Sequence, residues 1–442
     1  MSGVKKIDVQ SDSAMHNALN IFAVPPTNVS IHKSQWRELL PLNSIDESPY
    51  EFRVFSDSQW MDPSKVYLYL QLQLLKKTTT DATWVPVTNF DQKVAPIQAI
   101  GQSFVRQLRV NINGTDVYDS TAQYPYISYM RNELTYSPTV KDTWLSASGY
   151  HRDTKHNDPL SDGFVKRQRM SAASRVFEVM SRLDFDLANQ DLFLLNNLEI
   201  LFTVYKKEDK FLVHSLVPDD TTEYALKVHN VRLMVRTIDV QPSLNLSVMS
   251  MLEKTTAKYP LRRTEIRTCY LTDGRREFTH NIFSNVIPRR IVLAMVNNRA
   301  YNGDIALDPF KFEPFNVEEI LVNAGGITYP ASPYKMKWGG NGESCVLRPY
   351  MEMMDATMSG ENTTNGITLQ QYASGWTFFV VSLTPTPEDH RGFELVRNGT
   401  TTIHMRFSKE IEAPGVMLLC LAEFDQLLSI DQHRVVLGDG AV

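Results

Sequence analysis

The sequence predicts an all-β protein made of two tandem antiparallel β-sandwiches with short helices. Three observations predict this: the chain has 442 residues, apolar and polar residues alternate along many short segments, and the order of these segments repeats. A single hydrophobic core stops growing near about 250–300 residues, so two domains are expected. Hydrophobic residues at 43% and charged residues at 21% are typical of a globular protein, which excludes a disordered or fibrous chain.

Charge and cysteine content narrow the function classes. Lys and Arg number 45 against 50 Asp and Glu, so the chain as a whole is not expected to bind nucleic acid. Cys269, Cys345 and Cys420 are odd in number and far apart, which excludes a disulfide framework and a CxxC zinc site, and we expect ordinary half-buried residues. The first residues lack the apolar core of a signal peptide and no apolar run spans a membrane, so we expect a reducing compartment.

Strand signals dominate the chain. Over 66–74, Val and Leu alternate with Tyr and Gln, which predicts a strand with one buried face. The further runs of period two are 108–112, 183–187, 231–235 and 403–407. Asn113-Gly114 directly follows one of these runs and predicts a type I′ hairpin turn, because both central positions need positive φ.

The order of these segments repeats at an offset of roughly 200–225 residues. Segment 52–74 reads as a short strand, a Pro-containing turn and a long apolar strand, and 277–298 reads the same way. The hairpins are expected at 108–118 and 320–329, the short helices after them at 126–134 and 350–354, and the closing strands at 228–238 and 416–424. We expect about eight strands in each half.

These boundaries divide the chain into five segments. We expect an N-terminal arm (1–27), a first sandwich (28–240), a connecting helix (241–258), a second sandwich (259–431) and a C-terminal tail (432–442). The connecting helix rests on Pro242, Leu244, Val248, Met251 and Leu252, which have helical spacing. The arm and the tail are expected to be flexible.

Segment 137–174 resists the strand pattern, because it is polar and has no periodicity. We expect a long loop there, a feature that is uncommon unless it has a function. Its basic run 166–175, with Phe164 and Phe177 nearby, could contact nucleic acid or an acidic neighbour. A solvated loop, or one that pairs with another subunit, is the preferred interpretation.

Two clusters contain the residue types of a metal site. Asp184 and Asp186 flank Phe185 and could bind a hard cation, but the apolar residues of 183–187 occupy the inner face, so the pair is expected to face solvent. The second cluster lies in segment 137–174 and comprises His151, Asp153, His156 and Asp158. These residues could bind a borderline metal, but their spacing fits no regular face, so no metal site is predicted.

Catalytic and phosphate-binding motifs are missing from the sequence. The glycine cluster Gly339-Gly340-Asn341-Gly342 is not followed by the Lys-Ser/Thr and helix of a phosphate loop, so a mobile loop is expected. No Ser lies in a Gly-x-Ser-x-Gly motif and no His in His-Glu-x-x-His. We therefore predict no catalytic, cofactor-binding or metal-binding residue, and no enzyme.

Several long blocks carry a resemblance to a known family. They are 21–31 with Trp36, 252–263, 297–303, 308–312, 365–379 and 422–431. They resemble the double jelly-roll major capsid proteins of Maverick/Polinton-type elements and adintoviruses, over nearly the whole chain. Segment 137–174 matches no pattern of that family.

The resemblance implies a hexon-like shell subunit with two upright jelly rolls per chain. Three chains would form a pseudo-hexagonal capsomer, and capsomers would tile an icosahedral shell around double-stranded DNA. The implied partners are other copies of the chain and penton or minor capsid proteins, with DNA contacted indirectly at most. The implied location is the virion capsid after synthesis in the cytoplasm, with no cofactor and no catalysis.

Two alternatives stay open. A carbohydrate-binding or glycan-processing β-sandwich protein would need, for hydrolysis, a cleft with two facing carboxylates. A minor or host-domesticated capsid-like protein would share the fold and differ in copy number.

Overall fold

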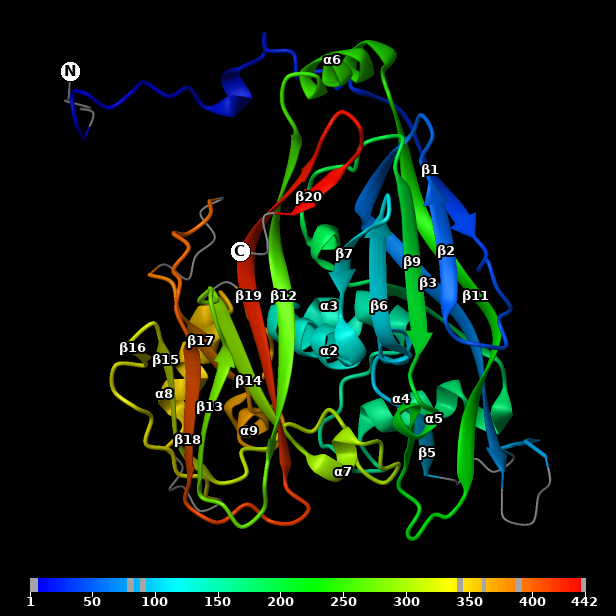
Figure 1. The fold of residues 1–442 in the computed structure, drawn as a ribbon, viewed down its shortest axis with the longest axis vertical. Helices are drawn as coiled ribbons and strands as arrows, with labels where there is room; N and C mark the ends of the chain where they lie inside the picture. Colours follow the sequence, from blue (N-terminus) through cyan, green and yellow to red (C-terminus); the bar gives the residue numbers. More distant parts are fainter. Residues whose placement is uncertain are drawn as a thin grey trace.

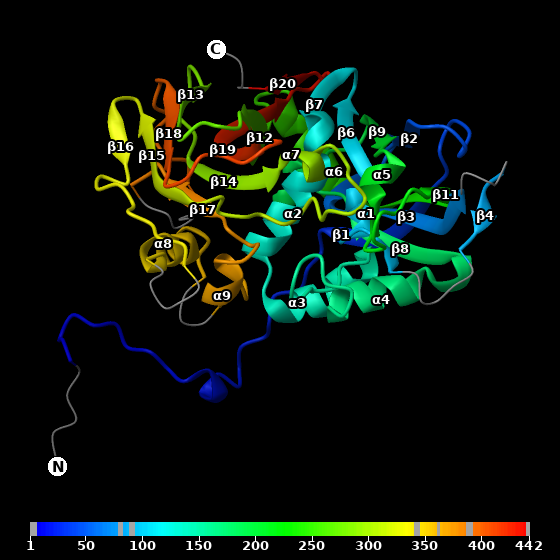
Figure 2. The ribbon, with the colours of Figure 1, turned by 90° about the horizontal axis from the view of Figure 1, so that it is seen from below.

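The computed structural model of the protein describes residues 7–77, 83–87, 93–339, 345–359, 363–385 and 392–438. Strands dominate these residues and form two antiparallel β-sandwiches, one from each half of the chain. The sandwiches stand side by side, the first in blue to green and the second in green to red (Figure 1). Short helices lie between them and along their sides (Figure 2).

The first sandwich has two main sheets. One has the order β1 (Ile31–Leu39), β11 (Glu223–Val240), β3 (Trp60–Lys77) and β8 (Phe177–Arg182), with β4 (Val85–Pro86) also pairing with β3. The other has the order β2 (Tyr50–Phe55), β9 (Glu199–Lys206), β6 (Val105–Ile112) and β7 (Thr115–Asp119). A separate small pair joins β5 (Val94–Pro96) to β10 (Val213–Ser215).

The second sandwich repeats this arrangement. One sheet has the order β12 (Ala257–Leu271), β19 (Val416–Ile430), β14 (Arg290–Asn297) and β17 (Phe379–Ser382), with β20 (Val436–Gly438) also pairing with β19. The other has the order β13 (Glu277–Phe283), β18 (Thr401–Phe407), β15 (Val317–Ala324) and β16 (Ile327–Tyr329). In both halves the last long strand lies between the first and the third. This is the strand order of a jelly roll, so the predicted double jelly roll is confirmed.

The alternation seen in the sequence explains the burial of the strands. In β3, Val66, Leu68, Leu70 and Leu72 are fully buried, whereas the residues between them are partly exposed. In β14, all residues over 291–296 are buried, because this central strand is covered on both faces. Apolar side chains of both halves belong to one continuous core.

The two hairpins use the same turn device. Asn113 and Gly114 have φ of 49° and 84°, as a type I′ turn requires, and Gly325 and Gly326 have φ of 60° and 85°. The Asn111 side chain accepts a hydrogen bond from the Gly114 N–H at 2.8 Å. At the equivalent place, the side chain of Asn323 accepts one from the Gly326 N–H at 3.1 Å.

The helices of the described residues are short. The α-helices are α1 (Ile100–Ser103), α2 (Tyr124–Thr135), α3 (Pro138–Asp142), α4 (Asp162–Met170), α5 (Asp209–Leu212), α6 (Pro242–Leu252), α7 (Asn298–Tyr301), α8 (Leu347–Ala356) and α9 (Leu369–Tyr372). The 3-10 helices are η1 (Asn17–Leu19), η2 (Thr121–Gln123), η3 (Trp144–Ser148), η4 (Ala172–Ser174) and η5 (Asp186–Asn189). α2 and α8 follow the two hairpins, and α6 joins the last strand of the first barrel to the first strand of the second.

Four expectations about secondary structure and cysteine burial need correction. Segment 137–174 is not a long loop, because α3, η3, α4 and η4 lie within it. Segment 183–187 is not a strand, since β8 ends at Arg182 and η5 begins at Asp186. The tail after 432 is not a free arm throughout, because β20 pairs with β19. Of the three free cysteines only Cys269 is half-buried, whereas Cys345 is exposed and Cys420 is buried.

Candidate functional site: the junction between the barrels

α2 lies between the two jelly rolls and packs its aromatic rings against the second one. The ring of Tyr129 stacks on that of Phe310, with centroids 4.2 Å apart and planes inclined by 8°. Tyr126 stacks on Tyr301 at 5.6 Å and meets Phe310 edge-on at 5.8 Å. Such pairs contribute about 0.5–1.5 kcal/mol each beyond the area they bury. α2 therefore belongs to the cores of both barrels.

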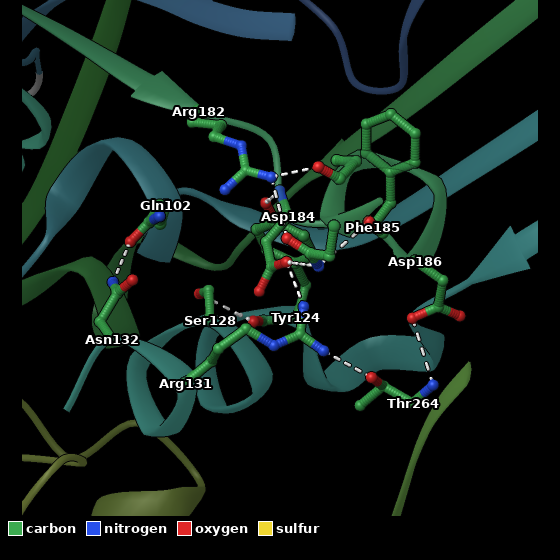
Figure 3. A network of polar contacts seen from close by, with 12 residues as sticks. Gln102, Tyr124, Ser128, Arg131, Asn132, Arg182, Asp184, Phe185, Asp186 and Thr264 are labelled. Carbon is green, nitrogen blue, oxygen red and sulfur yellow. Dashed lines mark hydrogen bonds and ion pairs between the residues drawn. The ribbon is translucent and has the colours of Figure 1, made fainter. Parts of the chain in front are cut away.

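A polar network on the other side of α2 ties the same elements together (Figure 3). The guanidinium of Arg131 donates one hydrogen bond to the carboxylate of Asp184 and another to the hydroxyl of Thr264 on β12. The backbone N–H of Thr264 donates to the carboxylate of Asp186 at 3.1 Å. The hydroxyl of Tyr124 accepts from the N–H of Asp184 at 2.8 Å. The network thus links α2, the segment after β8 and the second barrel.

The expectation that Asp184 and Asp186 face solvent is wrong. Their exposed fractions are 8% and 4%. The period-two argument fails here because β8 ends at Arg182, so the next residues follow no sheet alternation. Burial raises the pKa of Asp186 to about 7, and the nearby Arg131 charge lowers it only in part. Asp186 is consequently a buried carboxyl whose protonation couples to the junction.

A buried ion pair joins the far end of α2 to both barrels. The ammonium of Lys141 lies 2.8 Å from the carboxylate of Glu133 and donates at 2.9 Å to the backbone carbonyl of Glu133. It also donates to the carbonyl of Asn365 in the second barrel at 2.8 Å, which uses its third hydrogen. The hydroxyl of Tyr150 donates to Glu133 at 2.6 Å. Burial raises the pKa of Glu133, but Lys141 and Tyr150 together lower it by more than burial raises it. The pKa therefore lies below its ordinary value.

The structure does not bring His151, Asp153, His156 and Asp158, the second cluster considered, together as a metal site. Nδ1 of His156 lies 2.7 Å from the carboxylate of Asp308 in the second barrel, and both side chains are buried. Asp153 is ion-paired with Arg167 at 2.9 Å. His151 donates its backbone N–H to a glutamine, and Asp158 accepts from the N–H of residue 160. Among the described residues, no group of three or more His, Cys, Asp or Glu side chains could hold a metal ion.

The basic run 166–175 is only partly a solvated surface. Arg167 is 1% exposed and donates to Asp153 and to the carbonyls of Pro96 and His151. Phe164 is buried against His214, with ring centroids 5.6 Å apart. Polar residues of segment 137–174 point inward and pair with one another, which explains why the segment shows no apolar periodicity. Within the glycine cluster at 339–342, only Gly339 lies among the described residues.

An open cleft of about 570 Å³ lies at the junction. Its charged lining residues are Lys65, Arg131, Arg182, Asp191, Arg262, Arg289, Arg290 and Glu423. Glu423 is ion-paired with Arg290 at 2.8 Å, and although burial raises its pKa, that pairing places it below the ordinary value. A glycosidase needs one carboxyl with a raised pKa as general acid. Glu423 is therefore unsuited to that role, and Asp186, whose pKa is raised, does not line this cleft.

Sequence reasoning missed the charged residues of this junction. Arg131 and Glu133 interrupt a helix that is otherwise rich in Tyr and apolar residues. Charged residues on a helix flanked by core segments were the available signal, because they must be paired when the helix is buried. Lys141 lies in segment 137–174, where the sequence predicts a loop.

None of the described helices is both long enough and apolar enough to cross a membrane.

Comparisons with known proteins agree with this architecture. No protein-family model matches the sequence. An uncharacterized protein of Caenorhabditis elegans is 27% identical over 427 residues, covering 95% of this chain and 100% of the relative.

Solved structures match at lower identity and nearly full coverage. A chain of the Sputnik virophage matches with a TM-score of 0.67 and 12% identity, over 99% of this chain and 95% of that one. The mavirus major capsid protein matches with 0.53 and 10%, over 99% and 97%. The Faustovirus major capsid protein matches with 0.56 and 10%, over 94% and 93%. At such identities the likeness shows the fold, which is a double jelly roll.

Proposed function

We propose that this chain is a major capsid protein of a double-stranded DNA virus or virus-like mobile element of the Maverick/Polinton or adintovirus type. Three copies form a hexon-like homotrimeric capsomer, and capsomers tile an icosahedral shell. One observation carries the proposal: two jelly rolls of identical strand order, joined side by side, match capsid proteins over at least 93% of either chain.

The junction supports this function mechanically. A pseudo-hexagonal block made of three chains requires each chain to supply two similar units at a fixed angle. The stacked ring of Tyr129 and the buried pair of Lys141 and Glu133 hold the two barrels together without a flexible hinge. Closed three-fold symmetry needs a heterologous contact, in which one patch meets a different one, and two non-identical barrels supply such patches.

The proposal makes the chain a structural protein without catalytic, cofactor or metal residues. Its partners are other copies of itself and penton or minor capsid proteins, and contact with packaged DNA is indirect at most. Its place is the virion capsid.

Light scattering on the purified protein tests the first step. We expect a particle of three times the 50.5 kDa chain mass, and hexagonal blocks by negative-stain electron microscopy. Expression at high level should then yield closed shells. A stable monomer at high concentration would contradict the proposal.

The nematode relative favours one second candidate, a minor or domesticated capsid-like protein resident in a cellular genome. The relative matches over its whole length, so a related full-length chain exists in an animal. The copy number per particle separates the two: a major capsid protein accounts for most of the shell mass, and a minor one does not.

A further inference from the structure

The end of the molecule that carries α6 exposes apolar side chains. The helix contains no charged residue, and Leu244, Leu246 and Met251 are 40%, 74% and 56% exposed. Its inner side packs on the core through Val248, Met249 and Leu252. With 3.6 residues per turn, Ser243, Ser247 and Ser250 form the centre of the outer face, Leu244 and Met251 lie along one edge of it, and Leu246 lies along the other.

The N-terminal arm leaves the molecule beside this helix. The N–H of Gln241, just before α6, donates to the carbonyl of Ser30 at 2.9 Å, so the root of the arm is fixed there. Every residue over 7–29 is exposed, and the arm extends away from both barrels (Figure 1). Its large apolar residues, between 59% and 107% exposed, are Ile7, Val9, Met15, Leu19, Ile21, Phe22, Val24 and Val29.

The exposed area of the chain is larger than a folded monomer needs. The chain exposes 22762 Å². A compact monomer of 50.5 kDa exposes about 17,000 Å², so the excess is roughly a third. A standard protein–protein interface buries about 1,600 Å² in total. The surplus exceeds the area of a standard interface, so it is large enough for a substantial contact between chains.

The chemistry of the two surfaces points to protein and not to lipid. A helix that binds a membrane surface carries Lys or Arg on its polar face. α6 contains no Lys or Arg, and the arm contains them only at Lys5 and Lys6, whereas residues 7–30 contain none and include Asp8 and Asp12. The exposed apolar side chains of residues 7–29 and of α6 can therefore bury one another without burying a Lys or Arg charge.

We propose that the arm of one copy packs across the outer face of α6 of a neighbouring copy. The contact is heterologous, because an extended strap meets a helix face, so each copy gives one arm and receives another. The inference rests on the proposed function, since a shell or capsomer provides the neighbouring copies.

Photo-crosslinking in the full-length protein tests the contact directly. Phe22 is replaced by p-benzoylphenylalanine, and chains labelled with ¹⁴N and ¹⁵N are mixed before assembly and irradiation. We expect mass spectrometry to find crosslinks from position 22 to residues 242–252 in mixed heavy–light pairs. Crosslinks confined to single chains, or to surfaces outside α6, would overturn the proposal. Leu160, 84% exposed against 92% for Phe22, is the matched control position and should not crosslink to α6.

Charge substitutions provide the second test. Phe22→Asp and Leu246→Asp should each weaken association about ten-fold or more, because a carboxylate would be buried without a partner. Leu160→Asp should leave association unchanged, and circular dichroism checks that all three variants fold. Wild-type association by both variants would overturn the arm contact and leave the capsid function standing. Interchain crosslinks to α6 without shells or trimers would support the contact and contradict the function. Monomers without interchain crosslinks would contradict both.

Discussion

The two barrels share one strand order but differ in the segment between their fifth and sixth principal strands. In the first barrel this segment runs from β7 to β8 and holds α2, α3 and α4, and it contains the buried ion pairs Lys141–Glu133 and Arg167–Asp153. In the second it runs from β16 to β17 and holds α8 and α9. The charged pair on α8, Arg348 and Glu352, is partly exposed. The sheets are thus duplicated while the inserted segments differ. The first barrel's segment contributes the buried ion pairs, whereas the second barrel's segment contributes a neutral acceptor to the junction, the carbonyl of Asn365, and carries its ion pair on α8.

Replacing Lys141, whose ammonium is buried in the first barrel's segment, should give the largest loss in the free energy of unfolding. Lys141→Met leaves the Glu133 carboxylate buried with only Tyr150 as a side-chain partner, so we expect a loss of about 3–5 kcal/mol in the free energy of unfolding. Urea denaturation followed by circular dichroism measures it. Arg348→Gln, which removes the exposed pair on α8, should cost no more than about 0.5 kcal/mol. Equal losses at both sites would refute the contrast between the segments.

The buried carboxyl of Asp186 should make the free energy of unfolding depend on pH, which an exposed carboxyl should not. The pKa is raised from 3.8 to about 7 in the folded chain, so the folded chain holds a proton that the unfolded chain releases. Stability from this group is fully present below about pH 4 and is lost as pH rises to about 7, by roughly 2–4 kcal/mol. Asp186→Asn should flatten this part of the stability profile. The exposed Asp191→Asn serves as control, and an unchanged slope in the Asp186 variant would contradict the assignment.

Stacking between α2 and the second barrel should have a moderate effect. Tyr129→Leu keeps an apolar side chain but removes the stacked ring on Phe310, and we expect a loss of about 1–3 kcal/mol. Thermal denaturation should then show the barrels unfolding less cooperatively. Tyr350 on α8 is only partly buried, so Tyr350→Leu should change stability less. A larger loss at Tyr350 would place the barrel coupling elsewhere.

The duplicated turn should give the smallest and most equal effects. Asn111→Ala and Asn323→Ala each remove one side-chain hydrogen bond to a turn glycine, so each should cost about 0.5–1.5 kcal/mol. Chemical denaturation of both variants measures the two losses. Losses that differ by more than about 1 kcal/mol would show that the two hairpins, although alike in geometry, do not contribute equally to stability.

The sheets were predictable because the alternation of apolar and polar residues within each strand shows which of its faces is buried. The alternation at Val66 to Leu72 and the Asn113-Gly114 turn are local signals, and their repetition revealed the second barrel. The junction was not predictable in the same way. Lys141, Glu133 and Asn365 come together from distant parts of the chain, and no spacing in the sequence relates them. The predicted solvent exposure of Asp184 and Asp186 is wrong because the strand, and with it the period of two, ends at Arg182.

The position of β11 has a consequence for how the chain acquires its structure. β1 pairs with β11, so the first strand of the sheet has its partner about two hundred residues later in the chain. Such distant pairings slow folding, because the closure of a long loop precedes the contacts that reward it. The first barrel can close once β11 leaves the ribosome, whereas Lys141 gains its Asn365 acceptor only after much of the second barrel has been synthesised. We therefore expect the barrels to form in chain order and the junction to consolidate last, so that only a completed chain is rigid.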